Sequence, residues 1–296
     1  MNIDLERART FLSTHGRALD RRRFDAIVSG DDASRRAIVA GLNSYRNGDG
    51  GFGWGLEPDF RASESQPQGA QHALEALVDA APTTSPTLGA LFDWLSAVTL
   101  PDGGVPFSLP VKDPEGCAPF FLAADPSESS LQATSIIAAH AYQLARWDNA
   151  IAEHPWLVIA TRYCFDSIRK MDEAPMSYVL SFCLQFLDAA SDTQPESVDL
   201  LHHLARFIPR DGALRVEGGA EGESIHPLDY SPEPGRPTRE HIDPAAIAVD
   251  IERVANGQQD DGGWSVDFDS YSPAAALEWR GYATVNAVAA LFLNEQ

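Results

Sequence analysis

The chain has 296 residues, of which 44% are hydrophobic and 22% are charged, and its formal net charge is -21. This composition is typical of a globular protein, and the acidic excess argues against binding to nucleic acid or to an anionic membrane, because both require clustered Lys and Arg. The most apolar stretch, residues 283–293, is too short to span a bilayer. Three cysteines without a Cys-x-x-Cys pair, and an N-terminus without a signal-peptide pattern, predict a cytoplasmic protein with no disulfide framework.

Residues 1–30 are predicted to be a helical lead-in, in which the charged run 20–24 is a connector or a short helix. Behind it, an amphipathic helix followed by a largely apolar helix recurs in five rounds. The first helices are predicted over residues 32–46, 85–95, 153–170, 197–208 and 244–255. The second helices are predicted over residues 68–80, 128–145, 176–190 and 275–293. In the fourth round, a long surface loop over residues 216–237 stands where a second helix would be.

Strand-like runs are almost absent, so the predicted fold class is all-α. The second helices are apolar nearly all round, 128–145 most clearly, and such helices are buried on more than one side. We therefore expect residues 1–296 to form a single domain, an α/α toroid of about five to six helical hairpins with an inner and an outer helix ring. An open superhelical stack of helix pairs is the alternative, but its concave face is usually polar.

A short element, Asp-Gly-Gly followed by an apolar residue, occurs at residues 49–52, 102–105 and 261–264. Asp before Gly-Gly is ordinary turn chemistry, so these aspartates are predicted to be structural. In a ring of hairpins, the loops that lead from first to second helices lie on one face, where functional sites usually form. These loops are residues 47–67, 99–127, 171–175, 209–237 and 257–274.

Residues 258–264, Gln-Gln-Asp-Asp-Gly-Gly-Trp, resemble the Gln-Trp motifs of the squalene-cyclase and prenyltransferase repeat superfamily, and the two earlier Asp-Gly-Gly elements resemble weaker copies. Residues 268–273, Phe-Asp-Ser-Tyr-Ser-Pro, are similar to the segment after Gly-Gly-Trp in triterpene cyclases. The periodic resemblance runs from about residue 33 to 293. It implies a terpenoid cyclase-like α/α toroid, in which Gln braces backbone ends and Trp packs between hairpins, and a hydrophobic isoprenoid-type ligand.

The chain also departs from this superfamily. Triterpene cyclases have two α/α domains, and this chain has room for one. Their proton donor lies in an Asp-x-Asp-Asp motif, but the matching stretch here, residues 278–284, reads Glu-Trp-Arg-Gly-Tyr-Ala-Thr. The spacing of the prenyltransferase zinc ligands and the Asp-Asp-x-x-Asp magnesium motif are also missing. We therefore expect neither a metal nor another cofactor.

Acid-initiated chemistry requires a carboxylic acid that burial or a neighbouring carboxylate keeps protonated. The catalytic candidates are loop carboxylates. Glu57 and Asp59 lie in an unusual loop, and Asp267 and Asp269 are two residues apart, so both could point to one side. Glu278 lies near the start of the last helix, where a carboxylate commonly caps the helix instead.

Ligand-binding candidates are aromatic or basic residues on the loop face of the ring. Arg61 and Arg280 could bind an anionic head group or pair with the acids, and His226 could form an acid–base pair with Asp229. Ring faces stabilise a cationic carbon by about 0.5–2 kcal/mol each, although such rings often only seal one hairpin against the next. The full set is Trp54, Phe60, Arg61, Phe107, Phe120, Tyr271, Trp279, Arg280 and His226.

The expected function is binding of a hydrophobic isoprenoid-type small molecule, with acid-initiated cyclisation or isomerisation without metal. One alternative is a non-catalytic ligand-binding or scaffold protein on the same fold. Another is a glycosidase that uses two loop carboxylates as acid and base. The sequence carries no signal for an oligomeric state.

Overall fold

The computed structural model describes residues 3–295, which are mostly helical, so the predicted all-α class is confirmed. The helices and strands of these residues are α1 (Leu5–Thr14), α2 (Ala18–Ser29), α3 (Asp32–Leu42), α4 (Pro67–Asp79), α5 (Leu88–Val98), α6 (Pro119–Leu122), α7 (Leu131–Ala145), α8 (Asn149–Ala152), α9 (Pro155–Ile168), α10 (Ser177–Ala190), α11 (Glu196–Ala205), β1 (Leu214–Arg215), β2 (Ser224–Ile225), α12 (Pro227–Tyr230), the 3-10 helix η1 (Pro237–His241), α13 (Pro244–Asn256) and α14 (Pro273–Asn294).

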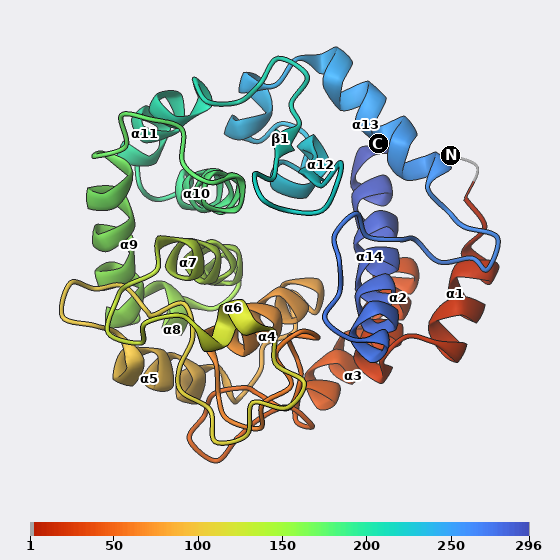
Figure 1. The fold of residues 1–296 in the computed structure, drawn as a ribbon, viewed down its shortest axis with the longest axis horizontal. Helices are drawn as coiled ribbons and strands as arrows, with labels where there is room; N and C mark the ends of the chain where they lie inside the picture. Colours follow the sequence, from red (N-terminus) through yellow and green to blue (C-terminus); the bar gives the residue numbers. More distant parts are fainter. Residues whose placement is uncertain (1–2, 296) are drawn as a thin grey trace.

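The chain passes once around the molecule, with α4, α7, α10, α12 and α14 nearer its middle than α3, α5, α9, α11 and α13 (Figure 1). Neighbouring second helices touch, since α4 packs on α7 and α7 on α10. The last helix, α14, packs on both α1 and α2, so the two ends of the helical sequence meet. The middle helices are not all parallel: α7 and α10 are seen along their axes in Figure 1, whereas α14 is seen from the side.

Burial of the second helices follows from their composition. In α7, the side chains of Ile136 and Ile137 are at most 2% exposed, and small residues around the helix, such as Ala138, are buried as well. This helix contacts α4, α9 and α10, so no face of it needs polar side chains for solvent. One continuous apolar cluster extends through α4, α7 and α10, and a second one joins α1 and α2 to α13 and α14.

The first two Asp-Gly-Gly elements pack on the first helix of the next round, α5 and α9, and the third packs on α1. Gly50, Gly103 and Gly262 have φ values of 95°, 98° and 95°, in the region that favours glycine. A Cβ on Gly50 would overlap the Ala90 carbonyl of α5, and one on Gly262 would overlap the Arg7 carbonyl of α1. The aspartate accepts a hydrogen bond from the second glycine amide in all three elements, which makes it structural.

The third element closes the chain onto its own beginning. Gln258 Oε1 accepts from the Asp4 amide at 2.9 Å, and Gln258 Nε2 donates to the Asp4 carbonyl at 2.9 Å. Trp264 is 5% exposed, and its ring N–H donates to the Val254 carbonyl at 2.7 Å. The turn thus holds α13 and α14 against α1.

Two segments are more ordered than their sequence indicates. The charged run 20–24 belongs to the regular helix α2, in which Asp20 and Arg23 are buried. The segment 216–237, predicted as a surface loop, contains β2, which pairs antiparallel with β1, and α12, whose Leu228 and Tyr230 are at most 3% exposed. Apolar side chains therefore anchor this segment to α10 and α13. Among the described residues, no helix combines the length and the apolar character needed to cross a membrane.

Candidate active site

The loop between α3 and α4 is buried over most of residues 51–62, which is unusual for a connection. Buried polar groups need partners, and this loop finds them in α4 and in α14. Its two carboxylates, Glu57 and Asp59, are 7% and 6% exposed. The loop thus brings predicted acids to the N-terminal ends of two helices that lie about 200 residues apart in the sequence.

Asp59 is held by two donors from the C-terminal segment. Its Oδ1 accepts from the Tyr271 amide at 2.8 Å, and its Oδ2 accepts from the Trp279 ring N–H at 2.7 Å. Burial raises the pKa of Asp59, and the negative charges of Glu57 and Glu278 raise it further, while the two hydrogen bonds oppose this in part. The structure therefore joins Asp59, Tyr271 and Trp279, three residues that the sequence singled out separately.

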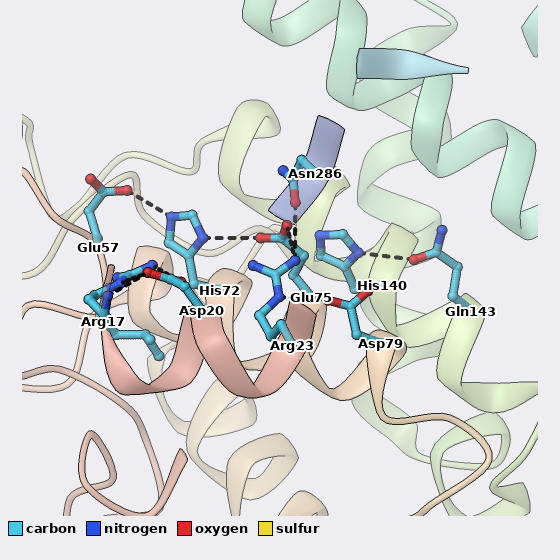
Figure 2. Close-up of polar contacts among 11 residues, drawn as sticks. Arg17, Asp20, Arg23, Glu57, His72, Glu75, Asp79, His140, Gln143 and Asn286 are labelled. Carbon is cyan, nitrogen blue, oxygen red and sulfur yellow. Dashed lines mark hydrogen bonds and ion pairs between the residues drawn. The ribbon is translucent and has the colours of Figure 1, made fainter. Parts of the chain in front are cut away.

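Glu57 connects this loop to a histidine. Its Oε2 lies 2.9 Å from His72 Nε2, and the other ring nitrogen, Nδ1, lies 3.1 Å from Glu75 Oε2 (Figure 2). Burial lowers the pKa of His72, but the hydrogen bonds to Glu57 and Glu75 outweigh it and raise the pKa to about 9. At neutral pH both ring nitrogens donate, and His72 is an imidazolium ion between two carboxylates.

The same row of charges continues into α2 (Figure 2). Arg23 donates from Nη2 to Glu75 Oε1 at 2.9 Å and from Nε to Asp79 Oδ2 at 2.6 Å. Burial acts to raise the pKa of Glu75, but Arg23 and His72 outweigh it and hold that pKa well below its usual range. Glu57, His72, Glu75, Arg23 and Asp79 therefore alternate in sign, which offsets the cost of burying them.

Aromatic rings cover His72 on the side of α14. Trp279 meets Phe268 at 5.2 Å and Tyr282 at 5.3 Å between ring centroids, both nearly perpendicular. The His72 ring lies 5.9 Å from Trp279 and 5.5 Å from Tyr282. Trp279, predicted as a ligand contact, thus links Asp59 to the aromatic cover of His72.

Arg61 and Glu278 form an ion pair beside this site. Arg61 Nη1 lies 2.7 Å from Glu278 Oε2, and Nη2 lies 3.2 Å from Oε1. The pairing occupies Glu278, which sequence analysis offered as an acid, and Arg61, which it offered as an anion binder. Their proximity to Asp59 still matters, because the negative charge of Glu278 contributes to the raised pKa of Asp59.

The predicted phenylalanines pack around Phe121 rather than around Asp59. Phe60 stacks on Phe121 at 4.6 Å, Phe107 stacks on it at 5.4 Å, and Phe120 lies 4.5 Å from it. Phe60 is buried, whereas Phe120 is 59% exposed. This small cluster seals loop 52–66 against the loop that carries α6.

The remaining candidates lie elsewhere. Asp267 accepts from the Ser224 amide at 3.1 Å and lies 3.9 Å from His226 Nε2, beside α12 and not beside Asp59. His226 is joined to Asp229 through its backbone: its amide donates to Asp229 Oδ2 at 2.7 Å, and its carbonyl accepts from the Asp229 amide at 2.9 Å. Asp269 is exposed and makes no contact with Asp267.

Trp54 and Arg280 have structural roles. Trp54, 57% exposed with a φ of 57°, donates from its ring N–H to Asn47 Oδ1 at 2.7 Å. Arg280 binds Asp261 of the third Asp-Gly-Gly element through two hydrogen bonds of 2.8 Å, and its guanidinium lies 4.5 Å from the centre of the Phe11 ring. Its role is therefore to brace the turn against α1.

Arg23, Glu75 and Asp79 are members of the site that sequence analysis did not single out. The available signal was the spacing of His72, Glu75 and Asp79, which are three and four residues apart and share one face of an otherwise apolar helix. Ionisable side chains at such positions are seldom buried unless they are paired. In the part of the chain that the structure describes, no group of three or more His, Cys, Asp or Glu residues is arranged to hold a metal ion.

No family model matches this sequence, and no curated protein matches it. Among solved structures, the chain is similar to a crystal structure of a protein from Actinoplanes, with 15% sequence identity, 98% of each chain covered and a TM-score of 0.58. At this identity the similarity shows the fold alone. It extends over the whole length of both chains.

Proposed function

We propose that the chain is a single-domain, terpenoid cyclase-like α/α toroid. Three features support this architecture: the Asp-Gly-Gly elements pack on α5, α9 and α1, the second helices contact one another in succession, and α14 packs against α1 and α2. In this proposal α2, α4, α7, α10, α12 and α14 form the inner ring. The short α12 replaces a full inner helix of the fourth hairpin.

We further propose that the protein binds a hydrophobic isoprenoid-type molecule and catalyses its acid-initiated cyclisation or isomerisation without a metal. The observation that carries this proposal is Asp59, a buried carboxyl group with a raised pKa beside the Trp279 ring and the Tyr271 backbone. Burial and two nearby carboxylates shift Asp59 toward the protonated form. A general acid needs this property at neutral pH.

In the reaction, the Asp59 O–H bond breaks and a C–H bond forms at one alkene carbon, which leaves positive charge on the other carbon. The Trp279 N–H stabilises the carboxylate that remains, because it donates to Asp59 Oδ2. Loss of a proton from a neighbouring carbon to this carboxylate completes an isomerisation and restores the acid. In a cyclisation, a second double bond attacks the cation before that proton is lost.

Access to Asp59 depends on the segment around Tyr271. Asp59 is 6% exposed, whereas Tyr271 is 49% exposed and covers it through its backbone. A substrate reaches the carboxyl group when this segment moves aside. The Trp279 ring and the Phe268 ring at 5.2 Å from it are then the nearest surfaces for a cationic intermediate.

A non-catalytic ligand-binding or scaffold protein on the same fold is the second candidate. It is favoured by the pairing of the acids: Glu57 is bound to His72, Glu278 to Arg61, and Asp59 to two N–H donors. A scaffold uses such pairs for stability alone. This candidate predicts that no isoprenoid is converted to product, whether or not it binds.

The test incubates the purified protein with free and diphosphorylated polyprenyl substrates, in magnesium or in EDTA, and identifies products by mass spectrometry. We expect product in EDTA, and a loss of about 10²- to 10⁴-fold in rate for Asp59→Asn, which cannot supply the proton. Asp199→Asn, on the exposed face of α11, is the matched control and should keep the wild-type rate. If no substrate is turned over and none stabilises the protein thermally, the proposed function is refuted. An active Asp59→Asn variant would refute the role of Asp59.

A further inference from the structure

A cavity of about 480 Å³ lies between α7, α9, α10 and the start of α11. Its volume is within the range of small-molecule sites. None of the residues of the candidate active site lines it, and α9 lies on the outside of α7 and α10 at this point (Figure 1). The cavity is therefore a separate place where a ligand could bind.

The floor and walls of the cavity are apolar or already satisfied. Leu157, Val158 and Phe165 of α9 contribute the apolar wall. The buried hydroxyl of Tyr142 pairs with Thr161 Oγ1 at 2.8 Å, and Thr161 donates to the Leu157 carbonyl at 2.6 Å. Because these hydroxyl groups already have partners, the body of a ligand needs to be apolar.

The charged rim has one unpaired group. Arg146 binds Asp192 at 2.9 Å, and Arg169 binds Asp166 at 2.7 Å as well as Glu196. Within residues 3–295, the Arg162 guanidinium has no hydrogen bond or ion pair. Each of the three carboxylates of the rim thus has an arginine partner, whereas the exposed Arg162 has no carboxylate partner.

The spacing along α9 places Arg162 on the same helix face as the apolar wall of the cavity. Val158, Arg162, Phe165 and Arg169 follow one another at intervals of four, three and four residues, so they share one helix face. A guanidinium presents several N–H donors in a fixed plane that matches a carboxylate. The rim offers a cationic ligand no carboxylate that lacks a partner, so an anion is the favoured occupant.

We propose that this cavity binds a small organic acid, with its carboxylate on Arg162 and its aliphatic or aromatic body against Leu157, Val158 and Phe165. The site is independent of the chemistry proposed for Asp59.

Isothermal titration calorimetry with octanoate tests this proposal, with 1-octanol and octylammonium as probes of the same apolar body without the negative charge. We expect wild-type protein to bind octanoate at least tenfold more tightly than either probe. Arg162→Gln should weaken octanoate binding at least tenfold and leave 1-octanol binding unchanged, because a charged hydrogen bond is lost. Arg210→Gln, an exposed arginine outside the cavity, is the matched control.

A second variant guards against misfolding. Val158 is 66% exposed, so Val158→Asp leaves the fold intact but places a carboxylate in the wall, and it should weaken octanoate binding more than 1-octanol binding. Asp59→Asn should bind octanoate like the wild type, which separates this site from the proposed function. Equal affinity for octanoate and 1-octanol, unchanged octanoate binding by Arg162→Gln, or no binding at millimolar octanoate would each overturn the proposal.

Discussion

Replacing His72 by glutamine should remove a pH dependence of stability that the wild type owes to one buried imidazolium ion. His72 lies between Glu57 and Glu75, and its pKa rises from the ordinary value of 6.5 to about 9 in the folded protein. A group with a raised pKa stabilises the fold fully below its unfolded pKa and loses that contribution as pH rises through its folded pKa. The window of the effect is therefore pH 6.5 to 9.

The size of the effect follows from the shift. Each pKa unit corresponds to about 1.4 kcal/mol, so the shift of His72 contributes about 3 kcal/mol at pH 6 and about 1 kcal/mol at pH 8.5. The wild type should thus lose roughly 2 kcal/mol of unfolding free energy between these pH values through His72. Burial lowers the pKa of His140, so that residue affects stability on the acidic side of the window.

The measurement is urea denaturation of the wild type, His72→Gln and His202→Gln at pH 6, 7, 8 and 8.5. The range stops there because three buried cysteines, whose thiols titrate near pH 8.5 in the unfolded chain, add their own dependence at higher pH. His202 is exposed on α11 and serves as the control. Parallel stability curves for the wild type and His72→Gln would refute the assignment of a charged His72.

Two further substitutions test packing. Gly262→Ala should cost at least about 2 kcal/mol of unfolding free energy in chemical denaturation, because its φ is 95° and its Cβ would overlap the backbone of α1. Gly218→Ala, with a φ of 78° in open space, is the control and should cost about 1 kcal/mol. Equal losses would contradict the close contact at Gly262. Arg23→Met should cost about 3–5 kcal/mol, because it leaves the largely buried Asp79 without its cation and removes one of the two cations beside Glu75, and the exposed Arg169→Met should cost no more than about 1 kcal/mol. An unchanged denaturation midpoint for Arg23→Met would mean that the row of charges contributes nothing to stability.

The helical class and most helix positions could be predicted because they depend on local patterns. The predicted second helix 128–145 corresponds to α7, and 176–190 corresponds to α10. The structure of segment 216–237 was harder to predict, because its Pro, Gly and Glu residues are typical of a loop. Apolar residues such as Leu228 and Tyr230 indicate that part of it is buried. Turn chemistry identified the Asp-Gly-Gly elements, but not the helix on which each one packs.

The site could be predicted in part. Loop composition indicated Asp59, Tyr271 and Trp279, and the structure places them in contact. The charged partners in α2 could not be predicted, because residues 21–23 are three consecutive arginines, a pattern typical of an exposed connector. The partners of Arg23 lie 52 and 56 residues away in α4 and 263 residues away in α14, so no short pattern records them.

The contact between Gln258 and Asp4 has a consequence for the order in which the protein is made. These two residues are 254 positions apart in the sequence, so α1 and α2 leave the ribosome long before the segment that they pack against. Until then Arg23 lacks Asn286, and the apolar faces of α1 and α2 lack α14. The faces of α1 and α2 that pack on α14 are thus buried only after α14 is made, and a nascent chain that stalls before residue 258 leaves this apolar surface exposed.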